Sequence, residues 1–359
     1  MPAKKGPCHG QGKIWISVKF HSDKTPRIDA VIAWVDGSDP EHQAKLHRCL
    51  KPGAKASTTR YADRGEIYYC IASILKYASF INRIWIVTDA QQPEFLGEFA
   101  KAGLCSPDFI RVVDHTELFG EHADVLPTFV SLSIEAMLWR LPGLSEHFVY
   151  FNDDFFVNRT LRPEEWFVDG RPVLRGLRTR PERWLFRTHA RRVLGRLNII
   201  KERSFRGATY SRVQEFGARC AGVTGHFMLA GHHPHPMRRS VQQEFYAARP
   251  ELLRRQIGYR FRDIGQFWPV ALANHLEIAL HGATFAKPPK EVYARPGSRN
   301  LSSRLASGIG SESPLFGCIQ SLDKFDAETL GLVRRLMRRK WGDFMPATIR
   351  LAGEDRAAA

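Results

Sequence analysis

The sequence is poor in cysteine and in long apolar runs. Its 359 residues include six cysteines, scattered without close pairs, which argues against a zinc site and against a disulfide framework and favours a reducing cytoplasm. No stretch approaches the roughly 20 apolar residues of a membrane-spanning helix. Because Met1–Gly12 carries basic residues with no apolar core behind them, we expect no secretory leader and a cytoplasmic location.

Acidic residues are also outnumbered, since 53 Lys and Arg stand against 37 Asp and Glu and give a formal net charge of +16. The excess is densest between Arg171 and Arg206, where eleven Arg and one Lys accompany only Glu182 and Glu202. Such a segment attracts polyanions or anionic lipid headgroups. Three partners are therefore open: nucleic acid, an acidic polymer, and the inner membrane surface as a peripheral contact. The absence of a helix-turn-helix, zinc-finger or RNA-recognition signature disfavours nucleic acid.

Apolar periodicity predicts an α/β fold. Buried strands are predicted at Ile28–Val35, Ile84–Thr88, Phe109–Val113 and Phe148–Phe151, and amphipathic helices at Glu66–Ala78 and Ser131–Leu141. Strands that alternate with helices indicate a mainly parallel sheet flanked by helices. Further along the chain, Arg249–Leu280 and Ala327–Trp341 are helical in pattern.

Two adjacent carboxylates, Asp153 and Asp154, follow Asn152 at the end of the strand predicted at Phe148–Phe151. Carboxylates between apolar segments are rare unless they are paired or bind a cation. The carboxyl ends of strands are where ligands bind in an α/β sheet, and two hard oxygen ligands suit Mg²⁺ or Mn²⁺ held against a diphosphate. A plain β-turn explains the same residue types, and this segment alone favours neither interpretation.

The loop after the first predicted strand is a second candidate. Trp34 could stack on a nucleotide base, Gly37 allows close approach of the backbone, and Asp36 or Asp39 could reach a ribose or a metal. A turn with a buried tryptophan accounts for the loop equally simply, and taken alone the loop favours that explanation.

Together, these motifs resemble the conserved regions of the Stealth family. The first region matches Ile28–Pro40; the second matches Arg60–Glu66, Ile84–Asp89 and Leu126–Asp154; the third matches His232–Met237 with Tyr259–Asp263; the fourth, the weakest, matches Phe316–Asp323. The family includes bacterial capsular polysaccharide polymerases that transfer hexose-1-phosphate and the catalytic subunit of animal N-acetylglucosamine-1-phosphotransferase. The resemblance implies a fold like that of the nucleotide-diphospho-sugar transferases.

The sequence departs from the family pattern at two places. The fourth region of the family usually reads C-(L/I)-N-D, whereas Gln320 and Ser321 occupy the last two positions here. If the Asn-Asp pair holds substrate or metal, Gln320 or Asp323 must take over that role. An Arg-Ser pair in the second region is replaced by Ala72-Ser73, so the substrate can differ from that of better-known members.

The resemblance also implies roles for individual residues. His232 is the expected catalytic base, with His235 as the second choice, because a histidine pKa near 6.5 suits proton transfer. Arg262 is expected to bind phosphate oxygens, and Asp153 and Asp154 to hold the metal. The donor is expected to contact Trp34, Asp36, Gly37, Ser131, Glu135 and Asn152. Three histidines alternating with proline in an extended segment converge poorly, so zinc is disfavoured.

The function implied is transfer of a sugar-1-phosphate from a UDP-sugar to a glycan hydroxyl, with release of UMP, in capsular or extracellular polysaccharide synthesis. A metal-dependent glycosyltransferase that releases UDP is the alternative, and a charge-driven nucleic-acid or lipid-binding protein is a third possibility. We expect one catalytic domain, made of an α/β part (27–160), a basic helical insertion (161–225) and a helical completion (226–350), between a flexible extension (1–26) and a frayed tail (351–359).

Overall fold

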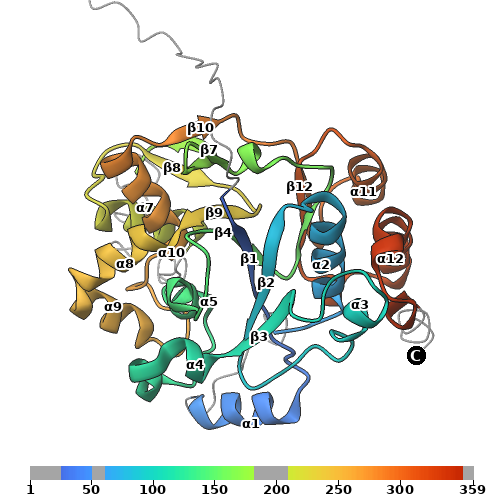
Figure 1. Ribbon diagram of the computed structural model, residues 1–359, viewed down its shortest axis with the longest axis horizontal. Coiled ribbons are helices and arrows are strands. Elements are labelled where there is room, and N and C mark those ends of the chain that lie inside the picture. Colours follow the sequence, from blue (N-terminus) through green and yellow to red (C-terminus); the bar gives the residue numbers. More distant parts are fainter. Residues whose placement is uncertain (1–25, 51–60, 182–208, 351–359) are drawn as a thin grey trace, which may run out of the picture.

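A five-stranded sheet forms the centre of the molecule in the computed structural model, which describes residues 26–50, 61–181 and 209–350. Across the sheet the strands are β3 (Ile110–Asp114), β2 (Ile81–Thr88), β1 (Ile28–Ala33), β4 (His147–Asn152) and β9 (His235–Arg238) (Figure 1). The first four are parallel, and β9 runs antiparallel to β4. The expected mainly parallel α/β sheet is thus confirmed.

The register brings different parts of the sequence to one edge of this sheet. Ala33 pairs with Asn152 at the ends of β1 and β4, and Tyr150 pairs with His235 at the start of β9. The loop after β1, the turn after β4 and the segment before β9 therefore meet at the same edge, which is where ligands bind in parallel α/β sheets.

Both faces of the sheet are buried, which explains why its strands are almost continuously apolar. Ala30 and Ile32 belong to one core, whereas Val31 belongs to the other. The first core is covered by α2 (Glu66–Tyr77), α11 (Leu301–Gly310) and α12 (Ala327–Trp341). The second is covered by α5 (Ser131–Glu135), α7 (Tyr210–Cys220), α8 (Arg239–Ala247), α9 (Pro250–Ile257) and α10 (Pro269–Leu276) (Figure 1).

Two smaller sheets complete the fold. One consists of β11 (Glu291–Ala294), β12 (Phe316–Ile319) and β5 (Phe155–Val157), and the other of β10 (Thr284–Ala286), β7 (Arg171–Thr179) and β6 (Phe167–Val168), with β8 (Phe227–Ala230) paired to β7. The turn that holds Asp153 and Asp154 connects β4 to β5. β12 pairs with β5 beside this turn, and β11 pairs with β12. Shorter helices are α1 (Pro40–Cys49), α3 (Glu98–Lys101) and α4 (His115–Phe119).

Three sequence expectations need correction. The helix predicted at 131–141 ends at Glu135, because bonds from Met137 N to Ile134 O and from Arg140 N to Met137 O, both 2.9 Å, tighten the chain into 3₁₀ turns. The stretch 249–280 is interrupted between α9 and α10. The first part of the basic insertion expected to be helical forms β6 and β7 instead, because its residues pair with β10 and β8.

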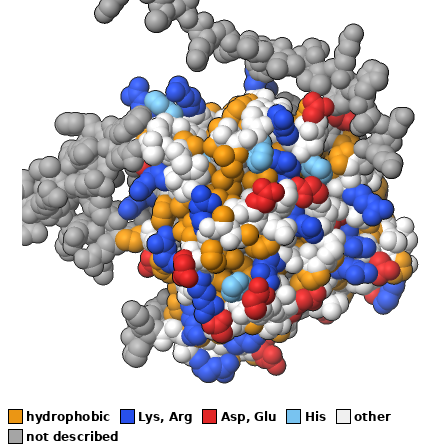
Figure 2. Space-filling view, turned by 60° about the vertical axis from the view of Figure 1, so that its left-hand side comes forward, with side chains coloured by type: hydrophobic (Ala, Val, Ile, Leu, Met, Phe, Trp, Pro, Cys, Tyr) orange, Lys and Arg blue, Asp and Glu red, His pale blue; other side chains and the backbone are white. Residues whose placement is uncertain are grey.

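Several expectations lie outside the described residues. These are the flexible extension up to residue 25, most of the basic segment at 182–208, and the tail at 351–359. Over the described ranges, no helix combines the length and apolar character needed to cross a membrane. On the face shown in Figure 2, Lys and Arg side chains are interspersed with acidic and apolar ones.

Candidate active site

Asp153 and Asp154 form the turn between β4 and β5, at the carboxyl edge of the central sheet. The Cys318 thiol of β12 donates to Oδ2 of Asp154 at 3.4 Å, and the Ile319 amide donates to the Asp154 carbonyl at 3.2 Å. Oδ1 of Asp154 is buried and has no hydrogen-bond partner among the described residues. A buried carboxylate oxygen without a donor is costly, so Oδ1 of Asp154 is suited to binding a cation or an external donor.

Two further carboxyl groups approach this pair from the start of α2. Burial and the neighbouring Asp63 raise the pKa of Glu66 to about 8. Burial, together with the charges of Asp154, Glu66 and Asp63, raises the pKa of Asp153 well above its ordinary value, and burial raises the pKa of Asp154 to about 6. Burial and mutual repulsion therefore favour the protonated forms of these groups, and a bound cation would favour their ionised forms.

The donor set fits a hard divalent cation bound together with a substrate. In the described ranges, no three His, Cys, Asp or Glu side chains are grouped so as to hold a metal by themselves. Mg²⁺ does not need three, because one or two carboxylates plus substrate phosphates are its usual ligands. The unpartnered Oδ1 of Asp154 and the mutual repulsion in this cluster fit Mg²⁺ or Mn²⁺ at Asp153 and Asp154.

Glu135 of α5 lies beside the end of β4. The Tyr150 hydroxyl donates to Oδ1 of Asn152 at 2.8 Å and to Oε1 of Glu135 at 3.3 Å. Burial raises the pKa of Glu135 to about 7, and hydrogen bonds from Ser131 and Trp268 and the charge of Arg262 act in the opposite direction. The sequence-predicted residues Ser131, Glu135, Asn152 and Arg262 therefore belong to one neighbourhood.

The loop that carries Arg262 is held by the Leu-Pro-Thr-Phe motif of the second conserved region. The Phe129 amide donates to the Arg260 carbonyl at 2.8 Å, and the Thr128 hydroxyl donates to the Tyr259 carbonyl at 2.9 Å. The rings of Phe129 and Phe261 stack with their centroids 5.5 Å apart. Arg262 itself is exposed, so its guanidinium can meet a ligand.

The loop after β1 joins the same group of contacts through Tyr61. The Gly37 amide donates to the Tyr61 carbonyl at 2.5 Å, and the Tyr61 hydroxyl donates to the Phe129 carbonyl at 3.0 Å. A side chain at Gly37 would overlap the Tyr61 backbone, so the glycine is needed for chain packing here. Oδ1 of Asp36 accepts a hydrogen bond from the Ser38 amide at 2.8 Å. Trp34 is 7% exposed, which leaves only an edge for a ligand.

The three histidines of the third region have different surroundings. The His232 ring is half-buried between the rings of Tyr210 and Tyr293. His235 is 2% exposed, faces Trp268 at 5.0 Å between ring centroids, and has an Nε2 without a partner among the described residues. His233 Nδ1 lies 2.9 Å from the Pro234 carbonyl. Of the three, His232 is therefore the most accessible to an acceptor.

Gln320 and Asp323, the substitutes expected in the fourth region, are separated by the left-handed turn at Ser321. Gln320 Oε1 accepts from the Tyr293 hydroxyl at 2.7 Å. Asp323 Oδ1 is buried without a partner in the described ranges. Gln320, which follows the end of β12, is thus connected to the His232 stack.

Sequence reasoning missed five residues that shape this site: Asp63, Glu66, Tyr150, Tyr293 and Cys318. Asp63 and Glu66 belong to the matched Arg60–Glu66 motif. The motif marks these residues, but it does not show that they lie beside Asp153. Tyr293 lies in a four-residue strand, too short for periodicity to reveal.

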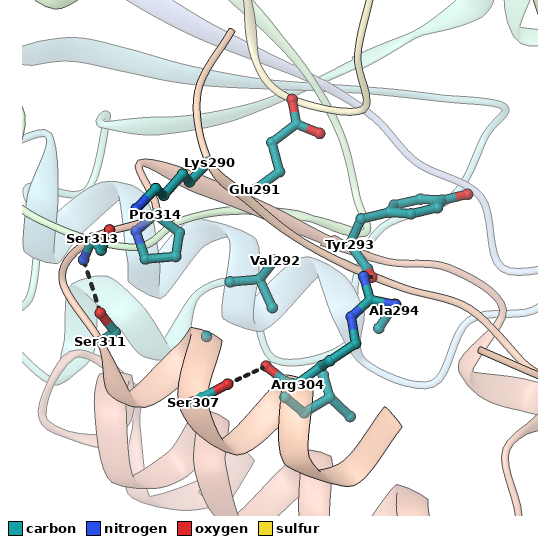
Figure 3. Close-up of a pocket in the computed structure, with 12 residues that line it drawn as sticks. Lys290, Glu291, Val292, Tyr293, Ala294, Arg304, Ser307, Ser311, Ser313 and Pro314 are labelled. Atoms are coloured by element: carbon teal, nitrogen blue, oxygen red, sulfur yellow. Dashed lines mark hydrogen bonds between the residues drawn. The ribbon is translucent and has the colours of Figure 1, made fainter. Parts of the chain in front are cut away.

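A separate cavity of about 330 Å³ lies between β11 and α11, lined among others by Val292, Arg304 and Ser311. Figure 3 shows Val292 on the cavity side, whereas the side chains of Glu291 and Tyr293 point to the opposite side of the strand. The cavity therefore adjoins the candidate site through β11, and Asp153 and Asp154 do not line it.

The fold and the site define an α/β protein with a candidate ligand-binding site at the carboxyl edge of its sheet. Models of the Stealth family match the chain over conserved region 1 (residues 26–51) and conserved region 2 (residues 60–173). Residues 26–51 and 60–173 of this chain are thus Stealth conserved regions 1 and 2.

Several relatives carry descriptive names. An exopolysaccharide phosphotransferase of Streptomyces coelicolor is 32% identical over 332 residues, which is 89% of this chain and 33% of the relative. A capsular polysaccharide phosphotransferase of Actinobacillus pleuropneumoniae, cps1A, is 40% identical over 147 residues, 39% of this chain and 38% of the relative. The chain therefore aligns with well under half the length of these relatives.

Solved structures show only a general likeness. The WbbM bifunctional glycosyltransferase gives a TM-score of 0.46 at 12% identity, covering 95% of this chain and 53% of that one. The galactosyltransferase LgtC gives 0.41 at 12% identity, covering 88% and 95%. Both scores lie below 0.5, so the family assignment depends on the sequence matches.

Proposed function

We propose that this protein transfers a sugar-1-phosphate from a UDP-sugar to a hydroxyl group of a glycan, releasing UMP, during synthesis of a capsular or extracellular polysaccharide. The names of its relatives support phosphotransfer in polysaccharide synthesis. The observation that carries the proposal is the meeting of a carboxylate pair, an exposed arginine and a half-buried histidine at one edge of the sheet. Phosphoryl transfer requires this combination of charge stabilisation and positioning.

Asp153 and Asp154 would hold Mg²⁺ or Mn²⁺, which neutralises diphosphate charge when bound. Arg262 would bind oxygens of the reacting β-phosphate, since a guanidinium offers two parallel donors to a phosphate. Glu135, held by Tyr150 and close to Ser131, would accept from sugar hydroxyls of the donor. Trp34, Asp36 and Gly37 would border the nucleotide, and Asn152 would orient donor oxygens.

His232 would remove the proton from the acceptor hydroxyl. Burial and the charge of Arg295 lower the pKa of His232, so its ring is neutral near pH 7 and can accept a proton. The acceptor oxygen forms a bond to the β-phosphorus while the bond from that phosphorus to the oxygen bridging the α-phosphate breaks. UMP leaves with that oxygen, and the proton stays on His232. His235 is too deeply buried to meet an acceptor and would support β9 beneath it.

The basic segment would contact the polyanionic product chain or the membrane surface at which the polymer is assembled. Its described part, β7, contributes the exposed residues Arg171 and Arg178. Co-sedimentation of the protein with anionic vesicles would indicate the membrane surface. Binding to a phosphodiester-linked glycan would indicate the product chain.

The test of the proposal is product analysis with Mg²⁺, a panel of UDP-sugars and glycan acceptors, resolving UMP from UDP. We expect UMP from the unaltered protein and none from Asp153→Ala or His232→Ala. UDP as the product would mean attack at the anomeric carbon, and would assign the protein to the metal-dependent glycosyltransferases instead. Salt-sensitive binding of nucleic acid or lipid, unchanged in Asp153→Ala and without turnover, would support the binding-protein alternative.

A further inference from the structure

The loop that presents His232 is clamped from two sides. From α7, the Tyr210 hydroxyl donates to the carbonyls of Ala230 and Gly231 at 2.9 and 2.8 Å. From β11, the Glu291 carboxylate accepts the backbone amide of His232. A side chain at Gly231 would come within 2.6 Å of Oε1 of Glu291. The backbone position of His232 is therefore set by two elements remote from it in sequence.

The His232 side chain is fixed by a second set of contacts. Its ring is stacked on Tyr210 with the centroids 4.6 Å apart and the planes 18° apart, and on Tyr293 at 4.9 Å and 9°. Nearly parallel rings on both sides restrict rotation about the Cβ–Cγ bond of the histidine. Glu291 and Tyr293 reach the histidine from the same face of β11, because they are two residues apart in the strand (Figure 3).

Tyr293 also reaches the carboxylate side of the site. Its hydroxyl donates to Oε1 of Gln320 at 2.7 Å. Gln320 directly follows β12, and the Cys318 thiol of that strand donates to Oδ2 of Asp154 at 3.4 Å. Tyr293 is therefore the side chain that connects the His232 ring with the strand supporting Asp154.

We propose that Tyr293 is a positioning residue that holds the His232 ring in register with the Asp153–Asp154 pair through its bond to Gln320. This inference rests on the proposed function for the role of His232. It also explains the glutamine at position 320, which is one methylene longer than the asparagine common in the family, because this length lets the side chain meet the tyrosine hydroxyl. Gln320 and Tyr293 then act as one unit.

The stack itself can be tested without any activity. Flanking tyrosine rings shift the ring protons of His232 upfield in the NMR spectrum, and the His232→Gln protein identifies these signals. We expect them to move downfield, towards the position of an exposed histidine, in Tyr293→Leu and to stay close to their original position in Tyr293→Phe, which keeps the stacked ring. Unmoved His232 signals in a folded Tyr293→Leu protein would overturn the proposal.

Turnover gives the second arm. Tyr293→Leu should lower kcat by about 10- to 100-fold, because small misplacement of a catalytic group has effects of this size, while the donor KM changes by less than about 3-fold. Tyr293→Phe and Gln320→Asn should each lower kcat by roughly 3- to 10-fold. The double variant Tyr293→Phe/Gln320→Asn should have about the same kcat as the two single variants, since each substitution removes the same hydrogen bond. Independent, multiplying effects would contradict the coupling.

Tyr77→Leu is the matched control, since Tyr77 is also a half-buried tyrosine but lies at the end of α2. It should leave the His232 signals and kcat unchanged. If the unaltered protein shows no turnover with any donor, the proposed function fails and the NMR arm alone decides the stack. If turnover is present but Tyr293→Leu matches Tyr77→Leu in kcat, the positioning role is wrong and the proposed function stands.

Discussion

Asp29 and Asp154 are carboxylates on neighbouring strands with opposite environments. Asp29, the second residue of β1, is fully buried and accepts from Asn82 Nδ2 at 2.8 Å, Trp85 Nε1 at 3.0 Å and Ser145 N at 2.9 Å. Asp154, in the turn after β4, has one weak thiol donor at 3.4 Å, and its Oδ1 has no partner in the described residues. The first carboxylate is satisfied by the protein, and the second is left to be satisfied by a ligand.

This difference distinguishes a carboxylate that stabilises the fold from one that we propose to serve the function. Three donors fixed by the fold make the Asp29 charge a stabilising part of the core. The crowding of Asp154 with the carboxyl groups of Asp153, Glu66 and Asp63 opposes folding in the absence of a cation. The same residue type should therefore give opposite results when it is replaced by its neutral isostere.

The largest effect is expected for Asp154→Asn. Turnover should fall by at least about 10³-fold, because the loss of a charge that organises phosphoryl transfer has effects of this size. The free energy of unfolding at pH 8 should stay the same or rise, since one repelling charge is removed. UMP release and urea unfolding on the same preparation check both statements, and retained turnover would contradict the first.

The matching substitution Asp29→Asn should act on stability alone. An amide nitrogen would face one of three buried donors, which should lower the free energy of unfolding by about 3 kcal/mol. The kcat per folded molecule should remain unchanged, as Asp29 lies inside the sheet. Urea unfolding followed by kinetics below the transition measures the two quantities. An unchanged free energy of unfolding in Asp29→Asn would mean that the Asp29 carboxylate does not stabilise the core.

Glu135→Gln sharpens the comparison through pH. Because burial raises the pKa of Glu135 to about 7, the folded state binds more protons than the unfolded state between about pH 4.5 and 7. The stability that this group contributes is fully present below pH 4.5 and is lost as the pH rises through 7. The glutamine variant should therefore be more stable than the original by about 3 kcal/mol at pH 8 and equal to it at pH 4.5. Urea midpoints across this range test the sign, with the exposed Glu251→Gln as control.

The smallest effect concerns the metal. At pH 8, Mg²⁺ at about ten times its dissociation constant should stabilise the protein by about 1.4 kcal/mol, which raises Tm by a few degrees. The effect should disappear near pH 5, because the pKa of Asp154 is raised to about 6 and the group is then protonated. Thermal unfolding with and without Mg²⁺ measures this shift. An equal shift in Asp153→Asn would place the ion elsewhere.

The central sheet could be predicted because its strands are apolar on both faces. β1 is apolar apart from Asp29, β4 is apolar between its two end residues, and α2 and α12 have clear helical periodicity. Helix α1 was missed although Asp39 accepts from the Glu41 amide at 2.8 Å and Pro40 occupies the first turn, which is a recognisable start signal. The break after Glu135 was not predictable, because the Trp139 indole donates to the Ala136 carbonyl at 3.0 Å and local apolar spacing does not report that contact.

The site was predictable where the chemistry is contiguous in sequence, as in Asn152-Asp153-Asp154. It was not predictable where partners come from distant segments. Glu66 is brought to the pair by the packing of α2 on β5, and Tyr293 by the pairing of β11 with β12. Neither contact leaves a trace in residue spacing. The role of Gln320 likewise depends on a hydroxyl 27 residues away.

The most direct test of the account follows the β-phosphorus itself. A UDP-sugar labelled with ³²P in the β-phosphate, incubated with the protein, Mg²⁺ and an acceptor, should transfer its label to the glycan while unlabelled UMP is released. Asp154→Asn should leave the label in the donor. Label recovered in UDP, with an unlabelled glycan product, would show attack at carbon and contradict the account.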